Sequence, residues 1–247
     1  MDMLISHAII MRIREFGESD LLVTFFTSDK GRLKGVANGG RKSRKRFANC
    51  LDLFCLAKLE YASKRSGELY FLNSCKLVHA FPGLRSDFSS LSLASYMIEL
   101  TEILFPQNVV DKGMFELLNR SFLVLDEGLE NNVIRIIFEA RAMALGGYGI
   151  NLDRCCICGR PYTGAGRAVF KRNRGGIACL NCEQESGPYP GMGSDAVKGL
   201  RQIQSQPLNK INGVQLTEEA IHEIKPVLKL HIEYRVGQRL KSAKYLE

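Results

Sequence analysis

The sequence lacks the features of a membrane or secreted protein. Its most apolar stretch, Leu91–Phe105, is interrupted by Glu99 and Glu102. It therefore falls short of the roughly 18 uncharged residues that a membrane span needs. Asp2 stands where a secretion signal would carry Lys or Arg. We therefore expect an intracellular protein with no membrane partner, in which cysteines are thiols or metal ligands rather than disulfides.

Patterns typical of enzymes are also scarce. The histidines do not combine with a Ser or Cys nucleophile into a catalytic set; they are His7, His79, His222 and His231. Residues 35–43 approach a phosphate-binding loop, but Arg41 separates the glycine from the lysine that should follow it directly. We expect no enzymatic activity and no small-molecule substrate.

Repeats and low-complexity tracts are absent as well, and the composition is that of a folded protein. Of the 247 residues, 45% are hydrophobic and 24% are charged, which suits one or two globular domains. The formal net charge is +8. It is uneven, at +6 over residues 1–80, −4 over 81–154, +3 over 155–191 and +3 over 192–247. A basic balance favours a polyanionic partner such as nucleic acid.

The first eighty residues have the alternation and turns of short strands. We expect strands over residues 8–14, 21–27, 32–37, 53–62 and 68–78. The third of these places Arg32 and Lys34 on one face. Five short strands predict a small antiparallel barrel, and an OB-fold has this number. An SH3-like barrel has a similar number, so the pattern alone does not choose between them.

After Phe81–Gly83 the hydrophobic period becomes helical. We expect helices over about 91–105, 111–125, 130–145, 194–204 and 217–241, the last interrupted or kinked at Pro226. Residues 155–191 are rich in Gly and Cys and have no period, so they look like an insertion. The sequence thus predicts an α+β protein with a barrel domain over 1–80 and a mostly α-helical domain over 81–247, carrying the insertion at 155–191.

Four cysteines in this insertion have the spacing of a metal site. They form two C-x-x-C pairs: Cys155, Cys158, Cys179 and Cys182. Two such pairs suit tetrahedral Zn²⁺, and four protein ligands leave no open position for catalysis. We expect one structural Zn²⁺; the alternative is four unrelated buried thiols. Cys156 is off the spacing and spare.

We expect the remaining cysteines to be small core residues of the strand region. They are Cys50, just before the fourth predicted strand, and Cys55 and Cys75 within strands.

A basic segment follows the third predicted strand. Its cations are Arg41, Lys42, Arg44, Lys45 and Arg46. Together with Arg32 and Lys34 they suit a groove that neutralises phosphates. Aromatic rings for base stacking are available at Phe16, Phe25, Phe26 and Tyr61. The alternatives are a solvated basic loop, or DNA contacts at the C-terminal cluster of Arg235, Arg239, Lys241 and Lys244.

Several motifs resemble the bacterial recombination mediator family RecO. They are Gly17–Thr27, Lys30–Leu33, Ala37–Lys42, the zinc insertion opening at Leu152–Cys155, and Leu240–Leu246. The order of strands, helices, four-cysteine insertion and helices agrees too, so the resemblance covers essentially the whole chain.

The resemblance implies an N-terminal OB-fold and a non-enzymatic role in DNA repair and recombination. It implies binding of single- and double-stranded DNA and annealing of complementary strands. Its further partners would be RecR and the acidic C-terminal tail of single-strand-binding protein, in loading RecA onto coated strands. It also implies a cytoplasmic, nucleoid-associated location. The cation for the tail would be Arg120, Arg135 or Arg141.

Two other functions fit parts of the pattern. A zinc-stabilised OB-fold module that binds RNA or acts in transcription would share the barrel and the cysteine pairs. A zinc hydrolase or nuclease would need an open metal position and nearby acids, for which only Glu183 and Glu185 are available.

Overall fold

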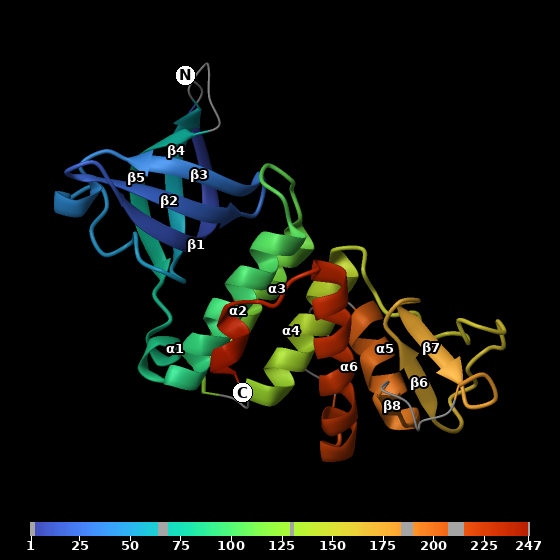
Figure 1. Ribbon diagram of the computed structural model, residues 1–247. Coiled ribbons are helices and arrows are strands. Elements are labelled where there is room, and N and C mark those ends of the chain that lie inside the picture. Colours follow the sequence, from blue (N-terminus) through green and yellow to red (C-terminus); the bar gives the residue numbers. More distant parts are fainter. Residues whose placement is uncertain (1–2, 64–68, 129–130, 184–189, 207–214, 247) are drawn as a thin grey trace. The chain divides into compact units, whose positions relative to one another are not determined.

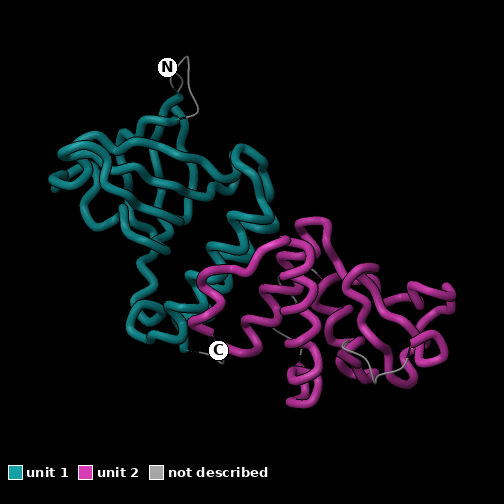
Figure 2. The backbone as a smooth tube through the Cα atoms, viewed as in Figure 1, with its two compact units in different colours: residues 1–129 teal, residues 130–247 magenta. Residues whose placement is uncertain are grey.

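The structure is a computed structural model that describes residues 3–63, 69–128, 131–183, 190–206 and 215–246 (Figure 1). Its backbone forms two compact units, residues 1–129 and 130–247 (Figure 2). The first three helices therefore belong to the same unit as the barrel, and the domain boundary expected after residue 80 stays a prediction. None of the described helices is both long and apolar enough to cross a membrane.

The first unit begins with a closed five-stranded barrel. Its strands are β1 (Met3–Phe16), β2 (Asp20–Thr27), β3 (Gly31–Ala37), β4 (Leu56–Ser63) and β5 (Tyr70–His79). Their order around the barrel is β1-β2-β3-β5-β4, and β4 pairs with β1 to close it (Figure 1). The pairs are antiparallel except β3 with β5, which are parallel. This closed arrangement of five strands confirms the expected OB-type barrel. The joint between β4 and β5 includes 64–68, outside the described residues.

A β-bulge at Met11 decides which side chains of β1 face the barrel interior. The pairing of β1 with β2 shifts between Ile10 and Arg12. Ile10 therefore packs in the barrel core beside Phe25 and Tyr61, while Arg12 points outward two residues later. The bulge lets one strand fill the core with its first half and present arginines with its second.

Three helices complete the first unit: α1 (Pro82–Ser86), α2 (Phe88–Leu104) and α3 (Lys112–Asp126). The short α1 occupies residues that the sequence suggested were only a break between strands and helices. It forms because the Asp126 carboxylate accepts hydrogen bonds from the N–H groups of Gly83, at 2.6 Å, and Leu84, at 3.3 Å. A long-range cap of this kind has no local sequence signature.

The connection between α2 and α3 is attached to the start of β3. Asn108 N–H donates to the Arg32 carbonyl at 3.0 Å. A Cβ on Gly31, whose φ is +73°, would lie only 2.0 Å from the Val109 carbonyl oxygen. Phe26, on the outer face of β2, is buried under Phe105 and Phe115. The apolar contact around Phe26 therefore joins the barrel to the helices that follow it.

The second unit packs three helices against a small sheet. It contains α4 (Asn131–Leu145), β6 (Ala168–Lys171), β7 (Gly176–Cys179), β8 (Gly191–Met192), α5 (Ser194–Ser205) and α6 (Glu218–Val236). Phe170 and Ile177 of the sheet share one core with Leu200 and Ile224 of the helices. One face of the sheet is thus covered by helices in the way its apolar side chains require.

The last helix is continuous at Pro226 and ends earlier than expected. It runs from Glu218 through Pro226 without interruption and ends at Val236 instead of continuing to Lys241. Gly237 stops it with a φ of 71°, and its N–H bonds to the Glu233 carbonyl. Its N-terminal end is capped by the Thr217 hydroxyl, which accepts from Ala220 N–H at 3.2 Å. The C-terminal residues form a 3₁₀ turn, η3 (Ser242–Tyr245).

Candidate metal centre and nucleic-acid interface

The two C-x-x-C pairs come together at one end of the small sheet. Cys155 and Cys158 lie on a turn that Gly159 closes with a φ of +74°, its N–H bonded to the Cys155 carbonyl. Cys179 ends β7, and a second turn follows in which Cys182 N–H bonds to the Cys179 carbonyl at 2.9 Å. The four sulfur atoms all lie within 4.8 Å of one another.

The sulfur geometry fits a tetrahedral metal ion. At a zinc–sulfur distance of about 2.3 Å, the sulfurs of a regular tetrahedron are about 3.8 Å apart. The Cys158 and Cys179 Sγ atoms are separated by 3.8 Å. That distance is too long for a disulfide, which needs about 2.05 Å. The cluster therefore has the ligand type, number and spacing of a structural zinc site.

The surroundings of the cluster also favour thiolates. Burial alone raises the pKa of the Cys155 thiol, but N–H groups of Cys158, Cys179 and Ile157 outweigh burial and lower it to about 6. Hydrogen bonds that the Cys182 thiol donates to the Cys158 and Cys179 sulfur atoms raise the pKa of Cys182 to about 12. Four thiols this close do not all ionise unless a cation joins them, so a metal ion and full deprotonation go together.

The other cysteines differ partly from the expectation. Cys50 and Cys55 are buried, as expected, but both lie in the segment before β4, so Cys55 is outside the strand expected for it. Cys75 is in β5, is partly buried, and accepts at its carbonyl from the Cys50 thiol at 3.3 Å. The Cys156 sulfur is not part of the four-sulfur cluster, and burial raises the pKa of its thiol.

A cationic cavity lies on the outer face of the barrel. Its volume is about 220 Å³, and its lining comes from β1, β2, β3 and α2: Arg12, Arg14, Leu22, Thr24, Arg32, Lys34 and Glu102. Strand register explains the grouping, because Arg12 pairs with Thr24 and Thr24 with Lys34, and paired residues share a face. The expectation that Arg32 and Lys34 lie on one face is confirmed.

Glu102 is the acid of this cavity and engages two of its arginines. Arg12 Nε donates to both Glu102 oxygens, at 2.8 and 2.7 Å, and this bond raises the pKa of Arg12. The Arg32 Nη1 atom is 4.0 Å from Glu102 Oε1. Burial lowers the pKa of Arg32, and its Nε is buried with no hydrogen-bond partner among the described residues. The cavity thus contains a buried donor, Arg32 Nε, that the Glu102 carboxylate does not satisfy.

The basic segment after β3 is exposed and partly anchored. It begins with the 3₁₀ turn η1 (Gly40–Lys42), where Arg41 N–H bonds to the Ser19 carbonyl at 3.0 Å. The Arg41 guanidinium pairs with Glu15 at 3.1 Å, and the Arg46 guanidinium donates to the Asn38 carbonyl at 2.6 Å. Lys42, Arg44 and Lys45 are exposed. These anchors put the segment beside the β1–β2 turn, at the same end of β2 as Leu22.

The expected stacking rings are mostly not on the surface. Phe25, Phe26 and Tyr61 are fully buried, and Phe16 alone of the four is exposed, at 48%. Phe25 and Tyr61 lie in the barrel core, and Phe26 is covered by the α2–α3 connection. Most of the rings that the sequence suggested for base stacking are buried in apolar cores, so this surface presents charge and few rings.

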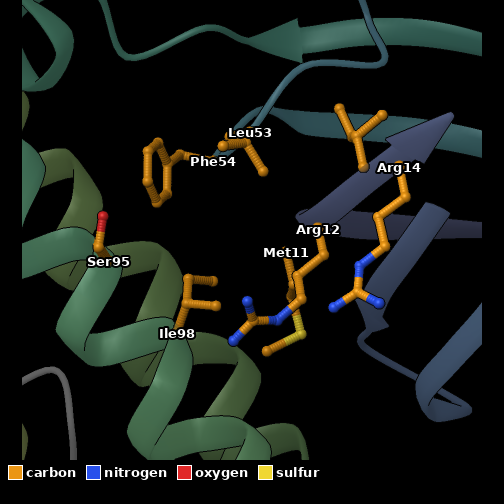
Figure 3. Close-up of a pocket in the computed structure, with 8 residues that line it drawn as sticks. Met11, Arg12, Arg14, Leu53, Phe54, Ser95 and Ile98 are labelled. Carbon is orange, nitrogen blue, oxygen red and sulfur yellow. The ribbon is translucent and has the colours of Figure 1, made fainter. Parts of the chain in front are cut away.

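A second cavity, of about 210 Å³, adjoins the first across β1. Figure 3 shows Ser95 and Ile98 of α2 on one side of it, Met11 and Arg12 of β1 on another, and Leu53 and Phe54 from the segment before β4. Arg12 and Arg14 line both cavities.

Sequence reasoning missed Arg12, Arg14 and Glu102 as parts of the basic face. The Arg-x-Arg alternation of Arg12 and Arg14 was a usable signal of the kind that identified Arg32 and Lys34. Glu102 had no such signal, because its place depends on how α2 packs on the barrel.

The cations considered for an acidic tail are in different situations. Arg135 pairs with buried Glu139 at 2.8 Å, and Arg141 is bonded to the Gln204 carbonyl. Arg120 is exposed on α3.

Comparison with known proteins assigns the family. The family model described as "Recombination protein O N terminal" matches residues 1–81, and "Recombination protein O C terminal" matches residues 85–244. A "DNA repair protein RecO" of Syntrophus aciditrophicus (strain SB) is 32% identical over 243 residues, covering 96% of this chain and 93% of that protein. Another of that name, from Desulfatibacillum aliphaticivorans, is 33% identical over 244 residues, covering 97% of this chain and 95% of its own length.

These matches extend over nearly the whole chain and agree with the closed barrel, the helices and the four-cysteine cluster. The chain belongs to the recombination protein O family of DNA repair proteins.

Proposed function

We propose that this chain is a non-enzymatic recombination mediator that binds single- and double-stranded DNA and anneals complementary strands. With RecR it helps to load RecA onto strands coated with single-strand-binding protein, at the bacterial nucleoid. The observation that carries the proposal is the cavity on the barrel where Arg14, Arg32 and Lys34 converge and where Arg32 Nε has no partner among the described residues.

A DNA phosphate has the chemistry that this cavity requires. Its oxygens accept from several guanidinium and ammonium donors at once, which would satisfy Arg32 Nε. The exposed cations from Arg41 to Arg46 would extend the contact to neighbouring phosphates. The site offers charge and few exposed rings, so we expect binding with little sequence preference.

Annealing needs positive charge rather than chemical energy. Two strands repel each other through their phosphates, and a protein that neutralises phosphates on both lowers this barrier. The sequence contains no intact phosphate-binding loop for ATP, because Arg41 interrupts the nearest match. Annealing should therefore proceed without a nucleotide.

The metal has a structural role in this proposal. Cys155, Cys158, Cys179 and Cys182 would hold one Zn²⁺, and four thiolate ligands complete its tetrahedral shell. The closed shell leaves the metal no position for water or substrate. The role of these residues is to join the two turns at the end of the small sheet.

The acidic tail of single-strand-binding protein needs a cation beside an apolar group. Arg120 meets this need better than Arg135 or Arg141, which are already bonded to Glu139 and to the Gln204 carbonyl. Leu123 lies three residues after Arg120 on α3, hence on the same side of the helix, and is 37% exposed. We assign the tail contact to this pair.

The DNA contact is tested by removing pairs of cations and measuring affinity against salt. Arg14→Ala/Lys34→Ala and Arg41→Ala/Lys42→Ala should each weaken binding of an oligothymidylate about tenfold and reduce the salt slope by about 1.4, two single-strand phosphate contacts. The matched control is Lys58→Ala/Lys76→Ala, which removes an exposed cross-strand pair of lysines from β4 and β5. Equal effects of all three variants would reject a specific site on this face.

The function is tested by annealing complementary oligonucleotides, bare and coated with single-strand-binding protein. Annealing should need no nucleotide and, on coated strands, should need the tail. Arg120→Ala should slow only the coated reaction, while the control Lys112→Ala on the same helix should not. Failure to anneal bare strands at normal DNA affinity would reject the mediator function and favour an RNA-binding or transcription-associated module.

A further inference from the structure

Tyr234, near the end of α6, lies against the tip of the β6–β7 hairpin. The guanidinium carbon of Arg172, from the hairpin turn, is 5.8 Å from the centre of the Tyr234 ring. That of Arg235 is 5.7 Å from the same centre. A Cβ on Gly175 would be 2.3 Å from Arg235 Nη2, so the arginine rests directly on the turn. Two elements far apart in the sequence thus place two guanidinium groups around one ring.

This cluster is exposed and carries positive charge. Tyr234 is 45% exposed, and Arg172, Arg174 and Arg235 are exposed as well. Among the described residues, no carboxylate forms a salt bridge with any of these three arginines. The neighbouring Lys171 differs, because it pairs with Glu183 at 2.7 Å. Two guanidinium groups around one ring, with exposed Arg174 on the same hairpin turn and no salt-bridged carboxylate among the described residues, favour an anionic ligand.

The combination of ring and cations selects single-stranded nucleic acid among anions. A Tyr ring and guanidinium planes stack on unpaired bases, and the arginines neutralise the phosphates between those bases. A duplex hides its base faces and would offer only phosphates. A small inorganic anion would use the arginines but not the ring.

We propose that Arg172, Arg174, Tyr234 and Arg235 form a second binding site, for single-stranded DNA, on the second unit. This inference rests on the proposed function and deepens it: the barrel face holds one strand through charge, and the Tyr234 site holds an unpaired strand by its bases. A chain with two such sites holds one strand by its backbone, which leaves the bases of that strand free, and holds another strand by its bases. Annealing then depends on both sites, whereas binding of one strand depends on either.

The chain contains no tryptophan, which allows a direct test. Tyr234→Trp introduces a single indole that can make the same stacking contacts. We expect its emission to be quenched as an oligothymidylate is added, with a midpoint that matches the rise in anisotropy of a labelled oligonucleotide. Tyr245→Trp is the control, since Tyr245 is 54% exposed and has Lys244 4.8 Å from its ring centre but lies outside the cluster. It should show little quenching.

Substitutions then connect the site to annealing. Arg172→Ala/Arg174→Ala in the Tyr234→Trp background should shift the quenching midpoint about tenfold, the loss of roughly one stacking or phosphate contact. Tyr234→Ala should slow annealing of bare strands about tenfold, and Tyr234→Phe should restore it, because the ring is kept.

The outcomes separate this site from the proposed function. If anisotropy rises normally while the indole emission of the Tyr234→Trp variant stays constant, the second site is rejected and DNA binding stands. Equal quenching in the Tyr245→Trp control leads to the same rejection. If the wild-type chain gives no rise in anisotropy with any DNA, the proposed function itself fails.

Discussion

The barrel and the small sheet solve the same problem, the stability of short strands, in different ways. The barrel closes on itself, so its ladder of hydrogen bonds continues from β4 back to β1, and its interior is filled by its own side chains, among them Phe25, Leu33 and Tyr61. The sheet has strands of four, four and two residues, and its apolar side chains are buried mainly against α5 and α6. A sheet that small is marginal alone.

The four cysteines lie at the end of the sheet where apolar side chains are no longer buried. Beyond β7 the chain continues with exposed Leu180 and Asn181, and the turn before the first pair is exposed too. A metal ion bound at this end would replace burial that the local sequence does not provide. The difference teaches that such an ion would serve the fold of the second unit.

The largest expected effect follows from breaking the four-cysteine cluster. Cys158→Ser should reduce bound zinc from about one per chain to near zero, because three thiolates hold the metal far less tightly. Amide exchange over the described part of the insertion, 155–183, should become at least about 100-fold faster. Exchange in β1–β5 should be unchanged, as should the thermal transition of the barrel.

Cys156→Ser is the matched control for this change. It removes an adjacent thiol that contributes no sulfur to the cluster, so zinc content and exchange should stay at wild-type values. Ordered, slowly exchanging amides over residues 155–183 in metal-free wild type would contradict the contrast between the two regions.

The next largest effect is expected from disrupting the contact between the barrel and the α2–α3 connection. Gly31→Ala should cost about 3 kcal/mol, since the new Cβ would meet the Val109 carbonyl oxygen at a position where φ is also positive. Gly17→Ala has a similar φ, +63°, with nothing within 4 Å of its Cβ, so it should cost only about 1 kcal/mol. Denaturant unfolding of both variants measures the difference; equal losses would mean that the close approach contributes nothing.

The sequence predicted those features that local patterns control. Alternation identified the five strands, helical periods identified the longer helices, and the spacing of Cys155, Cys158, Cys179 and Cys182 identified the cluster before its sulfurs were seen to lie together. In each case the signal and the structure that it specifies are within one element or one pair of turns.

The missed features all depend on distant contacts. The α1 helix forms because of Asp126, the stacking rings of Phe26 and Tyr61 disappear into cores, and Glu102 reaches the barrel from α2. An alternating strand does not reveal which of its faces a later helix will cover. Burial of aromatics, which competes with their exposure for binding, was therefore the least predictable part of the candidate site.

A smaller expected effect is a dependence of the second unit's stability on pH. His231 is fully buried, its Nε2 lies 2.6 Å from the Tyr148 carbonyl oxygen, and burial followed by the charge of Arg235 lowers its pKa. The unfolded chain takes up a proton below about pH 6.5 that the folded chain refuses. The contribution of neutral His231 to the free energy of unfolding is thus fully present above that pH. It declines as pH falls below it, by at most about 1.4 kcal/mol per pH unit.

His231→Phe is the variant that checks this dependence. It should lower stability at all pH values, because the Tyr148 carbonyl loses a partner, but the slope between pH 6.5 and 5.5 should be flatter than in wild type. Unfolding free energies at the two pH values, with zinc content measured in each sample, separate this effect from loss of the metal. An identical slope in wild type and variant would remove His231 from the explanation.

The smallest expected effect concerns the difference between the two basic surfaces, the barrel cavity and the Tyr234 cluster. On the barrel, Glu102 occupies Arg12 and lies near Arg32, whereas the Tyr234 cluster has no carboxylate paired with its arginines among the described residues. Glu102→Gln removes the competing charge and keeps an oxygen that accepts from Arg12. Affinity for an oligothymidylate should rise about threefold, well under 1 kcal/mol, with a steeper salt dependence.

Quenching in the Tyr234→Trp background should keep its midpoint, because Glu102 acts on the barrel site alone. Weaker DNA binding by Glu102→Gln would show instead that the carboxylate orients Arg12 and Arg32 for the phosphate rather than competing with it.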